Sequence, residues 1–141
     1  VIKVVDGDTV DIDFSDHPRE NTRIRLWGVD TPETVKENTP VQHYGPEASA
    51  FTRKNILYQR VRLKLEPGNT RDRYGRLLAY IYLPDGRMMN RMLVEQGYAY
   101  ADPRYDHPFR KEFLQLEAAA RREKRGLWKD VPPSELPYYK K

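Results

Sequence analysis

The sequence predicts an α+β domain with five β-strands and three α-helices, and three kinds of segment lead to this prediction. Short stretches in which apolar and polar residues alternate are typical of half-buried strands. Longer stretches with apolar residues three and four positions apart are typical of amphipathic helices. Glycines and prolines separate these stretches where turns and helix ends are expected.

The strands are expected at residues 1–5, 9–14, 23–29, 61–66 and 77–83. Asp6-Gly7 joins the first two strands and is a strong signal for a hairpin turn. Gly28 near the end of the third strand indicates a bulge or a close backbone approach. A polar loop is expected at 33–43, and a short returning strand is expected after the turn at 84–86.

The helices are expected to begin at Gly45-Pro46, at Asn90 and near Pro108, and the last of them to end at about Lys124. One helix between the third and fourth strands, with two more after the fifth, is the layout of a five-stranded OB-fold β-barrel packed with three α-helices. We expect this domain to span residues 1–128. The proline-rich residues 129–141 are expected to form an extended C-terminal tail.

Composition limits the possible functions. The 141 residues are enough for one domain with a real hydrophobic core. The absence of cysteine excludes a disulfide framework and thiolate zinc sites, and the three histidines are too dispersed for a histidine cage. The net charge of +4 and the pI of about 9.3 favour polyanionic partners mildly. No run of about eighteen apolar residues occurs, so we expect no membrane span.

Five polar residues at the ends of the strand-like segments indicate chemistry on phosphodiesters: Asp8, Arg25, Asp30, Glu33 and Arg76. Carboxylates bind hard cations through oxygen, and a further carboxylate can polarise a water molecule. Guanidinium groups match the oxygens of a phosphate. Each residue also has a purely structural alternative, because an Asp-Gly-Asp segment can be a simple turn and each arginine can be an exposed strand or turn residue.

The segments around these residues give the five positions more weight. Residues in four segments resemble, in order and in spacing, the staphylococcal nuclease (thermonuclease) family: 1–10, 25–34, 44–51 and 72–82. The resemblance covers roughly 1–128. It implies an OB-fold enzyme that hydrolyses DNA and RNA with Ca²⁺, leaving 3′-phosphate and 5′-hydroxyl products. It also implies a secreted protein, and we expect a monomer.

The resemblance also implies roles for individual residues. In the family, two aspartates and a backbone carbonyl bind one calcium ion, and these correspond here to Asp8, Asp30 and the carbonyl group of Thr31. Glu33 corresponds to the residue that positions, and by the usual account deprotonates, the attacking water. Because a carboxylate with an ordinary pKa is a weak base at neutral pH, such a step needs help from the metal.

The remaining implied residues contact the substrate. Arg25 and Arg76 would grip the scissile phosphate and neutralise the charge that grows during the reaction. Tyr74 is the best candidate for contact with the nucleotide, and single-stranded substrates are expected because bases stack on aromatic side chains. The family has a tyrosine pair before the last helix, but in the shorter segment 98–105 only Tyr105 can be matched to it.

Two other functions remain open. One is a catalytically silent, nuclease-like OB-fold module that only binds nucleic acid, and the other is an OB-fold module for protein or oligosaccharide partners. Intact residues at all five positions favour the enzyme. The chain begins at Val1 inside an expected strand, so a targeting segment for secretion would precede this residue.

Overall fold

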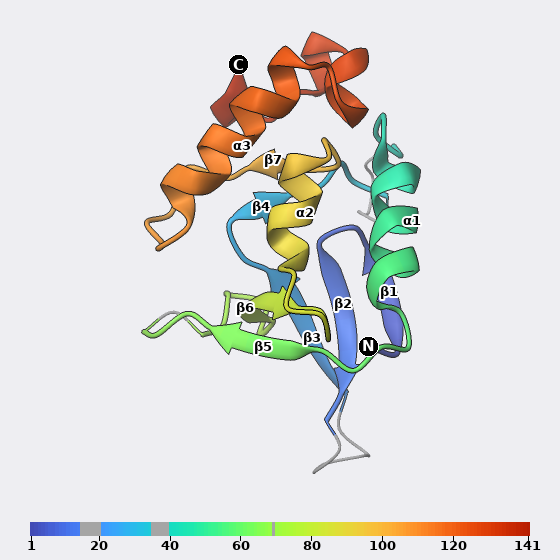
Figure 1. The fold of residues 1–141 in the computed structure, drawn as a ribbon, viewed down its shortest axis with the longest axis vertical. Coiled ribbons are helices and arrows are strands. Elements are labelled where there is room, and N and C mark those ends of the chain that lie inside the picture. The colour runs from blue at the N-terminus through green and yellow to red at the C-terminus, as the bar shows by residue number, and fades with distance from the viewer. Residues whose placement is uncertain (15–20, 35–39, 69) are drawn as a thin grey trace.

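The computed structural model describes residues 1–14, 21–34, 40–68 and 70–141. Its strands are β1 (Lys3–Asp6), β2 (Thr9–Asp13), β3 (Asn21–Leu26), β4 (Val29–Asp30), β5 (Arg62–Leu65), β6 (Leu77–Tyr82) and β7 (Tyr100–Ala101). Its α-helices are α1 (Gly45–Ile56), α2 (Met89–Glu95) and α3 (Arg110–Arg122). These elements confirm the α+β class (Figure 1).

Five strands form one sheet in the order β1-β2-β3-β6-β5, in which only β3 and β6 pair in parallel. In the antiparallel pairing of β2 with β3, Thr9 lies opposite Arg25. The N–H group of Leu26 donates to the Asp8 carbonyl oxygen at 2.8 Å. The turn after β1 and the end of β3 therefore meet at one corner of the sheet.

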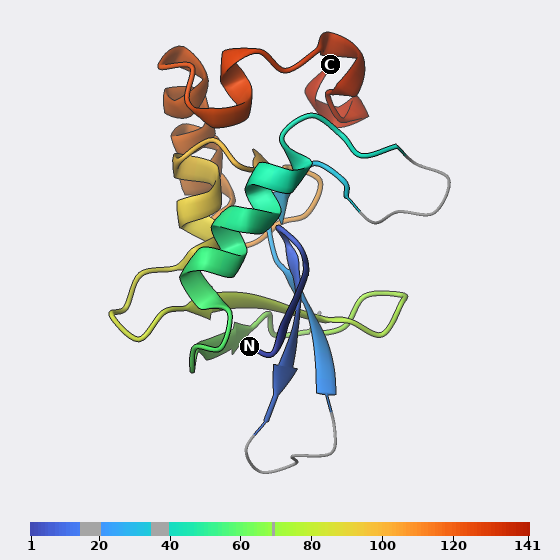
Figure 2. The ribbon, with the colours of Figure 1, turned by 90° about the vertical axis from the view of Figure 1, so that its right-hand side faces the viewer.

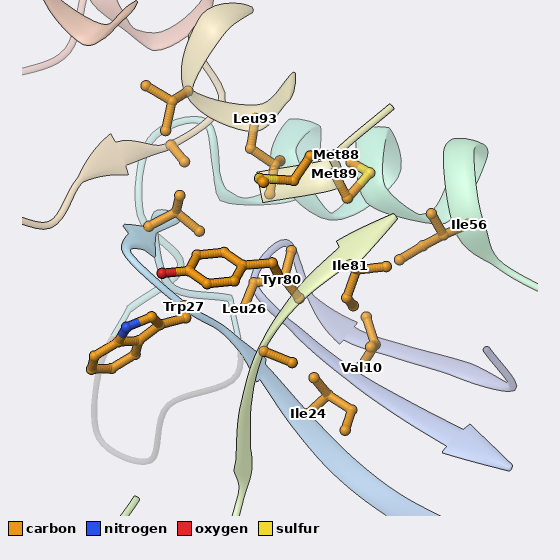
Figure 3. Packing of buried hydrophobic residues seen from close by; sticks show 14 of the residues in the cluster. Val10, Ile24, Leu26, Trp27, Ile56, Tyr80, Ile81, Met88, Met89 and Leu93 are labelled. Carbon is orange, nitrogen blue, oxygen red and sulfur yellow. The ribbon is translucent and has the colours of Figure 1, made fainter. Parts of the chain in front are cut away.

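The core fills the space between this sheet and the helices. Figure 3 shows Val10, Ile24 and Ile81 from three neighbouring strands beneath Met89 and Leu93 of α2. All five are fully buried, as expected from the alternation of apolar residues along the strands. Burial of such side chains provides the main favourable free energy of folding.

The helices pack against the sheet and against one another. Helix α1 packs on β1 and α2, while α2 also packs on β6 and α3. Helix α3 lies at the end of the molecule where β4 pairs with β7, and β2 and β3 extend away from it (Figures 1 and 2). Phe113 and Ala120, seven residues apart on one face of α3, are buried, as is typical of an amphipathic helix.

Two glycines allow the ends of α2 and α3 to lie very close to each other. Gly97 follows α2 with φ 81°, and a Cβ atom there would lie 2.3 Å from the Arg125 carbonyl oxygen. Gly126 follows α3 with φ 53°, and a Cβ atom there would lie 2.3 Å from the Gly97 carbonyl oxygen. The two backbones cross so closely that neither position has space for a side chain.

The structure differs from the sequence-based prediction in several elements. The two-residue strands β4 and β7 form a separate sheet that was not expected, and the expected returning strand is only a single bridge between Tyr82 and Met88. In the described residues, no strand pairing joins β1 to β5. Part of the expected polar loop, 35–39, lies outside the described residues.

A 3-10 helix, η1 (Gly126–Lys129), ends where the expected tail begins, and the tail itself contains two more, η2 (Pro133–Glu135) and η3 (Tyr138–Lys140). It folds back toward the segment that leads into α1 (Figure 2). The Glu135 carboxylate accepts the N–H group of His43 at 3.1 Å. The boundary between domain and tail at residue 128 stays a prediction. Across the described ranges, none of the helices has the length and apolar character that a bilayer crossing requires.

Candidate functional site

The turn between β1 and β2 brings Asp8 against the segment that follows β4. A Cβ atom at Gly7 would lie 2.8 Å from the Thr31 side chain, so glycine permits this close approach. The Thr31 N–H group donates to Asp8 Oδ2 at 2.9 Å, and the Thr9 hydroxyl donates to Asp8 Oδ1 at 3.0 Å. Two predicted metal residues, Asp8 and Thr31, are therefore in direct contact.

Arg25 lies between the two predicted metal-binding aspartates. Its Nη2 atom is 3.2 Å from Asp8 Oδ2 and 3.5 Å from Asp30 Oδ1. Its Nη1 atom donates to the carbonyl oxygens of Leu26 at 2.6 Å and Val29 at 2.7 Å. Burial opposes the charge of this side chain, but Asp8 and Asp30 outweigh that effect and raise the pKa of Arg25. Both terminal nitrogen atoms of the guanidinium are thus bound to neighbouring oxygens, and the group stays charged.

The carboxylates of this corner carry more negative charge than Arg25 compensates. Burial, followed by the charge of Asp8, raises the pKa of Asp6 to about 8, and Glu33 contributes to the same shift. Burial also raises the pKa of Asp30, although Arg25 opposes this. Burial acts in the same direction on Asp8, but Arg25 and the hydrogen bonds lower its pKa overall. Such crowding of carboxylates is relieved by protonation or by a bound cation.

The donor set suits a hard cation of the calcium type. Asp8 and Asp30 each place a carboxylate oxygen near Arg25 Nη2, and Thr31 lies in hydrogen-bond contact with Asp8. The buried Thr31 hydroxyl has no hydrogen-bond partner among the described residues. These residues contain no group of three or more His, Cys, Asp or Glu side chains that could hold a metal ion. A cation here would therefore need water or substrate oxygens to complete its coordination.

Glu33 is fixed through its backbone at the edge of this corner. Its N–H group donates to Gln42 Oε1 at 2.8 Å, and its carbonyl oxygen accepts the Gln42 N–H group at 2.9 Å. The side chain is half-buried, and its charge acts on Asp6. The predicted residue for water activation is thus close enough to the carboxylates to influence them.

Arg25 also lines a cleft of about 490 Å³ on its other side. The cleft collects the other predicted substrate residues, namely Arg76, Tyr74 and Tyr105. Its remaining lining residues are Trp27, Gly28, Val29, Arg71, Asp72, Arg73, Leu78, Asp102 and Arg104. Asp8, Asp30, Thr31 and Glu33 do not line it. We call the group formed by Asp6, Asp8, Asp30 and Glu33 the acidic corner, and the cleft with its arginines the cationic cleft. Arg25 belongs to the cationic cleft and contacts Asp8 and Asp30 of the acidic corner.

Arg76 is oriented by a carboxylate four residues earlier. Its Nε atom donates to Asp72 Oδ2 at 2.6 Å, while Asp72 Oδ1 accepts the N–H groups of Tyr74 and Arg76. Burial works against this carboxylate, but the bonds from Arg76 and Tyr74 lower the pKa of Asp72. Tyr74 is 68% exposed, with the Arg76 guanidinium 5.4 Å from its ring centroid. One turn thus presents an arginine and an aromatic ring to the cleft.

Tyr105 contributes a second aromatic surface. Its ring centroid lies 5.0 Å from that of Trp27, and the Arg104 guanidinium lies 5.7 Å from the Tyr105 ring. Asp102 binds Arg104 through both carboxylate oxygens, at 2.9 and 2.7 Å. The structure therefore brings Tyr105 to the same cleft as Tyr74, although only Tyr74 belongs to a motif that was recognised in the sequence.

Sequence reasoning missed four parts of this site. Asp6 was interpreted only as a turn residue, and the pairs formed by Asp72 with Arg76 and by Asp102 with Arg104 were not noticed. The short spacing between aspartate and arginine could have indicated both pairs. The fourth part is Tyr139, whose hydroxyl donates to Asp30 Oδ2 at 2.5 Å. No local pattern in the sequence signals a contact between residues so far apart in the chain.

Comparisons with known proteins agree with the motifs. The family model described as staphylococcal nuclease homologue matches residues 23–130. A thermonuclease of Staphylococcus hyicus is 44% identical over 129 residues, which cover 91% of this chain and 73% of that protein. A thermonuclease of Staphylococcus intermedius is 44% identical over 131 residues, covering 91% and 74%.

A more distant relative is the endonuclease YncB of Bacillus subtilis, 33% identical over 128 residues, which cover 89% of this chain and 59% of that protein. The family model covers Arg25, Asp30 and the cationic cleft but begins after Asp6 and Asp8. On this evidence from motifs, geometry and identity, the chain belongs to the family of staphylococcal nuclease homologues.

Proposed function

We propose that this protein is a calcium-dependent phosphodiesterase that hydrolyses DNA and RNA to 3′-phosphate and 5′-hydroxyl products. The observation that carries the proposal is the position of Arg25, whose guanidinium contacts both the buried Asp8 and the half-buried Asp30, while Arg25 also lines the cationic cleft. Support also comes from the relatives, which are named thermonuclease and endonuclease.

Calcium would be held by the carboxylates of Asp8 and Asp30 and by the carbonyl oxygen of Thr31. When bound, it would supply positive charge that polarises the phosphodiester and a nearby water. The raised pKa values of Asp6 and Asp30 support this assignment, because burial and mutual repulsion disfavour ionisation of these carboxylates and a bound cation would offset both effects.

Arg25 and Arg76 would bind the two sides of the scissile phosphate. Both are oriented in advance, Arg25 by carbonyl groups and aspartates and Arg76 by Asp72. Donors that are already fixed do not need to reorganise as charge grows on the phosphate oxygens, and this preorganisation is an effective way to lower a barrier. Planar guanidinium groups also match the geometry of phosphate oxygens.

Glu33 would orient the attacking water and accept its proton. Its backbone is fixed by Gln42 from both directions, which limits where the carboxylate can move. As the water proton passes to the carboxylate, the water oxygen would form a bond to phosphorus and the bond from phosphorus to the 5′ oxygen would break. The phosphate stays on the 3′ side, and the departing 5′ oxygen takes up a proton from solvent to become the 5′-hydroxyl. General-base assistance of this kind contributes typically 10²–10⁴-fold.

Single strands are the proposed substrate form. Tyr74 and Tyr105 both line the cleft and are 68% and 47% exposed, so their rings are accessible to unpaired bases. Stacking on aromatic rings tolerates every base, which suits an enzyme that acts on both DNA and RNA. The arginines of the cleft would hold the backbone.

We further propose an OB-fold barrel, a monomer and secretion. The sheet order β1-β2-β3-β6-β5 with β6 running parallel to β3 supports an OB-fold arrangement of strands. Analytical ultracentrifugation would test the monomer. Localisation of the full gene product would test secretion.

The test of the proposed function is cleavage of single-stranded DNA and RNA oligonucleotides with calcium, and again after addition of a chelator. We expect cleavage with calcium only, with 3′-phosphate ends identified by mass spectrometry. A protein that shifts the oligonucleotide in a gel but never cleaves it would be a binding module instead. Products with 5′-phosphate ends would contradict the proposed direction of bond breaking.

A further inference from the structure

A tyrosine near the end of the chain contacts the acidic corner directly. The hydroxyl of Tyr139 donates to Asp30 Oδ2 at 2.5 Å, across 109 positions of the sequence. Arg25 lies on the other oxygen of the same carboxylate, with Nη2 3.5 Å from Oδ1. The two oxygens of Asp30 therefore have different partners, and together these partners fix the rotation of the carboxylate.

The Tyr139 ring is itself held in place from the cleft side. The Arg104 guanidinium lies 4.4 Å from the ring centroid, a distance at which a cation and an aromatic face attract each other. Asp102 holds this guanidinium through both of its oxygens and is itself buried. Tyr139 thus lies between a carboxylate of the acidic corner and an arginine that lines the cleft.

The neighbouring residue fastens this part of the chain to α3. Lys140 Nζ lies 2.6 Å from Glu117 Oε1, and the two side chains are only 8% and 10% exposed. The other oxygen of Glu117 accepts the N–H group of Ala101 at 2.7 Å. Because β7 pairs with β4, placing Tyr100 opposite Asp30, Lys140 is anchored to the same strand pair that positions Asp30.

We propose that Tyr139 is a positioning residue, which orients the Asp30 carboxylate so that Oδ1 is presented to the metal ion. The inference rests on the proposed function, because it assigns Asp30 to calcium. Partners that hold a metal-binding carboxylate by hydrogen bonds are part of the site, and their loss typically costs about 10–100-fold in metal affinity or activity. Residues 138–140 are then part of the active site and not a dispensable extension.

The experiment compares Tyr139→Phe with Tyr58→Phe in the full chain. Both variants lose one hydroxyl, but Tyr58 is 80% exposed, does not line the cleft and serves as the matched control. Calcium affinity is measured by titration calorimetry with the metal alone. Turnover and KM are measured on a single-stranded oligonucleotide, and unfolding in urea reports whether each variant keeps the parent's stability.

We expect Tyr139→Phe to lose about 10–100-fold in calcium affinity or in kcat at subsaturating calcium, with KM for the oligonucleotide little changed. Tyr58→Phe should match the parent in all three measurements. If Tyr139→Phe loses only stability in urea while calcium affinity and kcat match the parent, the hydroxyl has a purely structural role and the inference is wrong.

Higher turnover in Tyr139→Phe would also overturn the inference, since it would make the contact inhibitory. A parent protein that neither binds calcium nor cleaves would refute the proposed function and the inference together. A parent that does both, with a Tyr139→Phe variant that behaves identically, would refute only the inference.

Discussion

Arg25 Nη2 lies 3.2 Å from Asp8 Oδ2 in the buried corner of the site, while the same guanidinium lines the open cleft. The Arg25 side chain therefore belongs to both the buried corner and the open cleft. It neutralises a buried carboxylate, and it presents charge to whatever occupies the cleft. Its Nη1 atom donates to two carbonyl oxygens, which limits how far the guanidinium can turn.

Replacement of Arg25 by lysine should show how much of its contribution to turnover comes from the planar geometry of the guanidinium and how much from its charge. Arg25→Lys keeps the charge but loses the planar fork, and we expect turnover to fall by roughly 10²-fold or more, about 3 kcal/mol of transition-state stabilisation. Affinity for the oligonucleotide should change far less. Arg23→Lys is the matched control, because Arg23 lies on the same strand in an exposed pair with Asp11. Parent turnover in a folded Arg25→Lys protein would remove this residue from catalysis.

Asp72 should act through Arg76. Asp72→Asn removes the charge that fixes the Arg76 guanidinium, and we expect about a tenfold or greater loss of kcat, approaching that of Arg76→Lys. Asp85→Asn provides the control, since Asp85 forms a similar but exposed pair with Arg87 outside the cleft. Steady-state kinetics on one oligonucleotide would compare the three variants. Additive losses in an Asp72→Asn, Arg76→Lys double variant would contradict this coupling.

Glu33→Gln keeps the size of the side chain and removes the base. We expect kcat to fall by about 10²–10⁴-fold with little change in calcium affinity, because Glu33 is proposed to act on water. The comparison variant is Glu47→Gln, an exposed residue in the first turn of α1. Single-turnover rates would measure the effect, and a weakening of calcium binding as large as the loss of rate would make Glu33 a metal ligand instead.

Calcium should stabilise the folded protein as well as activate it. At a calcium concentration about 100 times Kd, binding to the folded state alone adds about 2.7 kcal/mol to the free energy of unfolding. Magnesium should do so poorly, since it demands tight octahedral geometry and retains its waters. Thermal unfolding with each ion would show this, and Asp30→Asn should abolish the calcium shift. Equal shifts with both ions would contradict a site specific for calcium.

His107 should make stability depend on pH. Burial, opposed only in part by Glu66 and Asp102, lowers the pKa of His107. The unfolded chain therefore takes up a proton first, at about pH 6.5. The stabilisation that the neutral His107 ring provides is complete above about pH 6.5. It is lost as the pH falls from there toward the pKa of His107 in the folded protein, which is lower. Urea unfolding between pH 8 and 5, compared in the parent and His107→Gln, should show a shallower dependence in the variant.

The sequence predicted most of this arrangement, for reasons that particular residues make clear. The motifs that contain Asp8, Arg25 and Asp30 are local, and the resemblance of these motifs to the staphylococcal nuclease family indicated a common site. The strand alternation around Val10 and the spacing of Phe113 and Ala120 gave the correct class of fold. All of these signals depend on periodicity or on residues that are neighbours in the chain.

The parts that were missed depend on contacts over long distances in the sequence or on very short elements. Strands β4 and β7 contain two residues each, too few for any alternation to be recognised. The hydrogen bond from Tyr139 to Asp30 depends on how the tail folds back, which no local pattern encodes. Asp6 was missed because its unusual pKa arises from burial beside Asp8, and burial is a property of the folded chain.

The crossing of Gly97 and Gly126 limits how this family member can diverge. A methyl group at either position would force apart the ends of α2 and α3, and β7 lies on the chain between these two helices. Because β7 holds β4 in register at Tyr100 and Asp30, the displacement would reach the acidic corner. Two residues without side chains thus restrict sequence change through backbone packing alone.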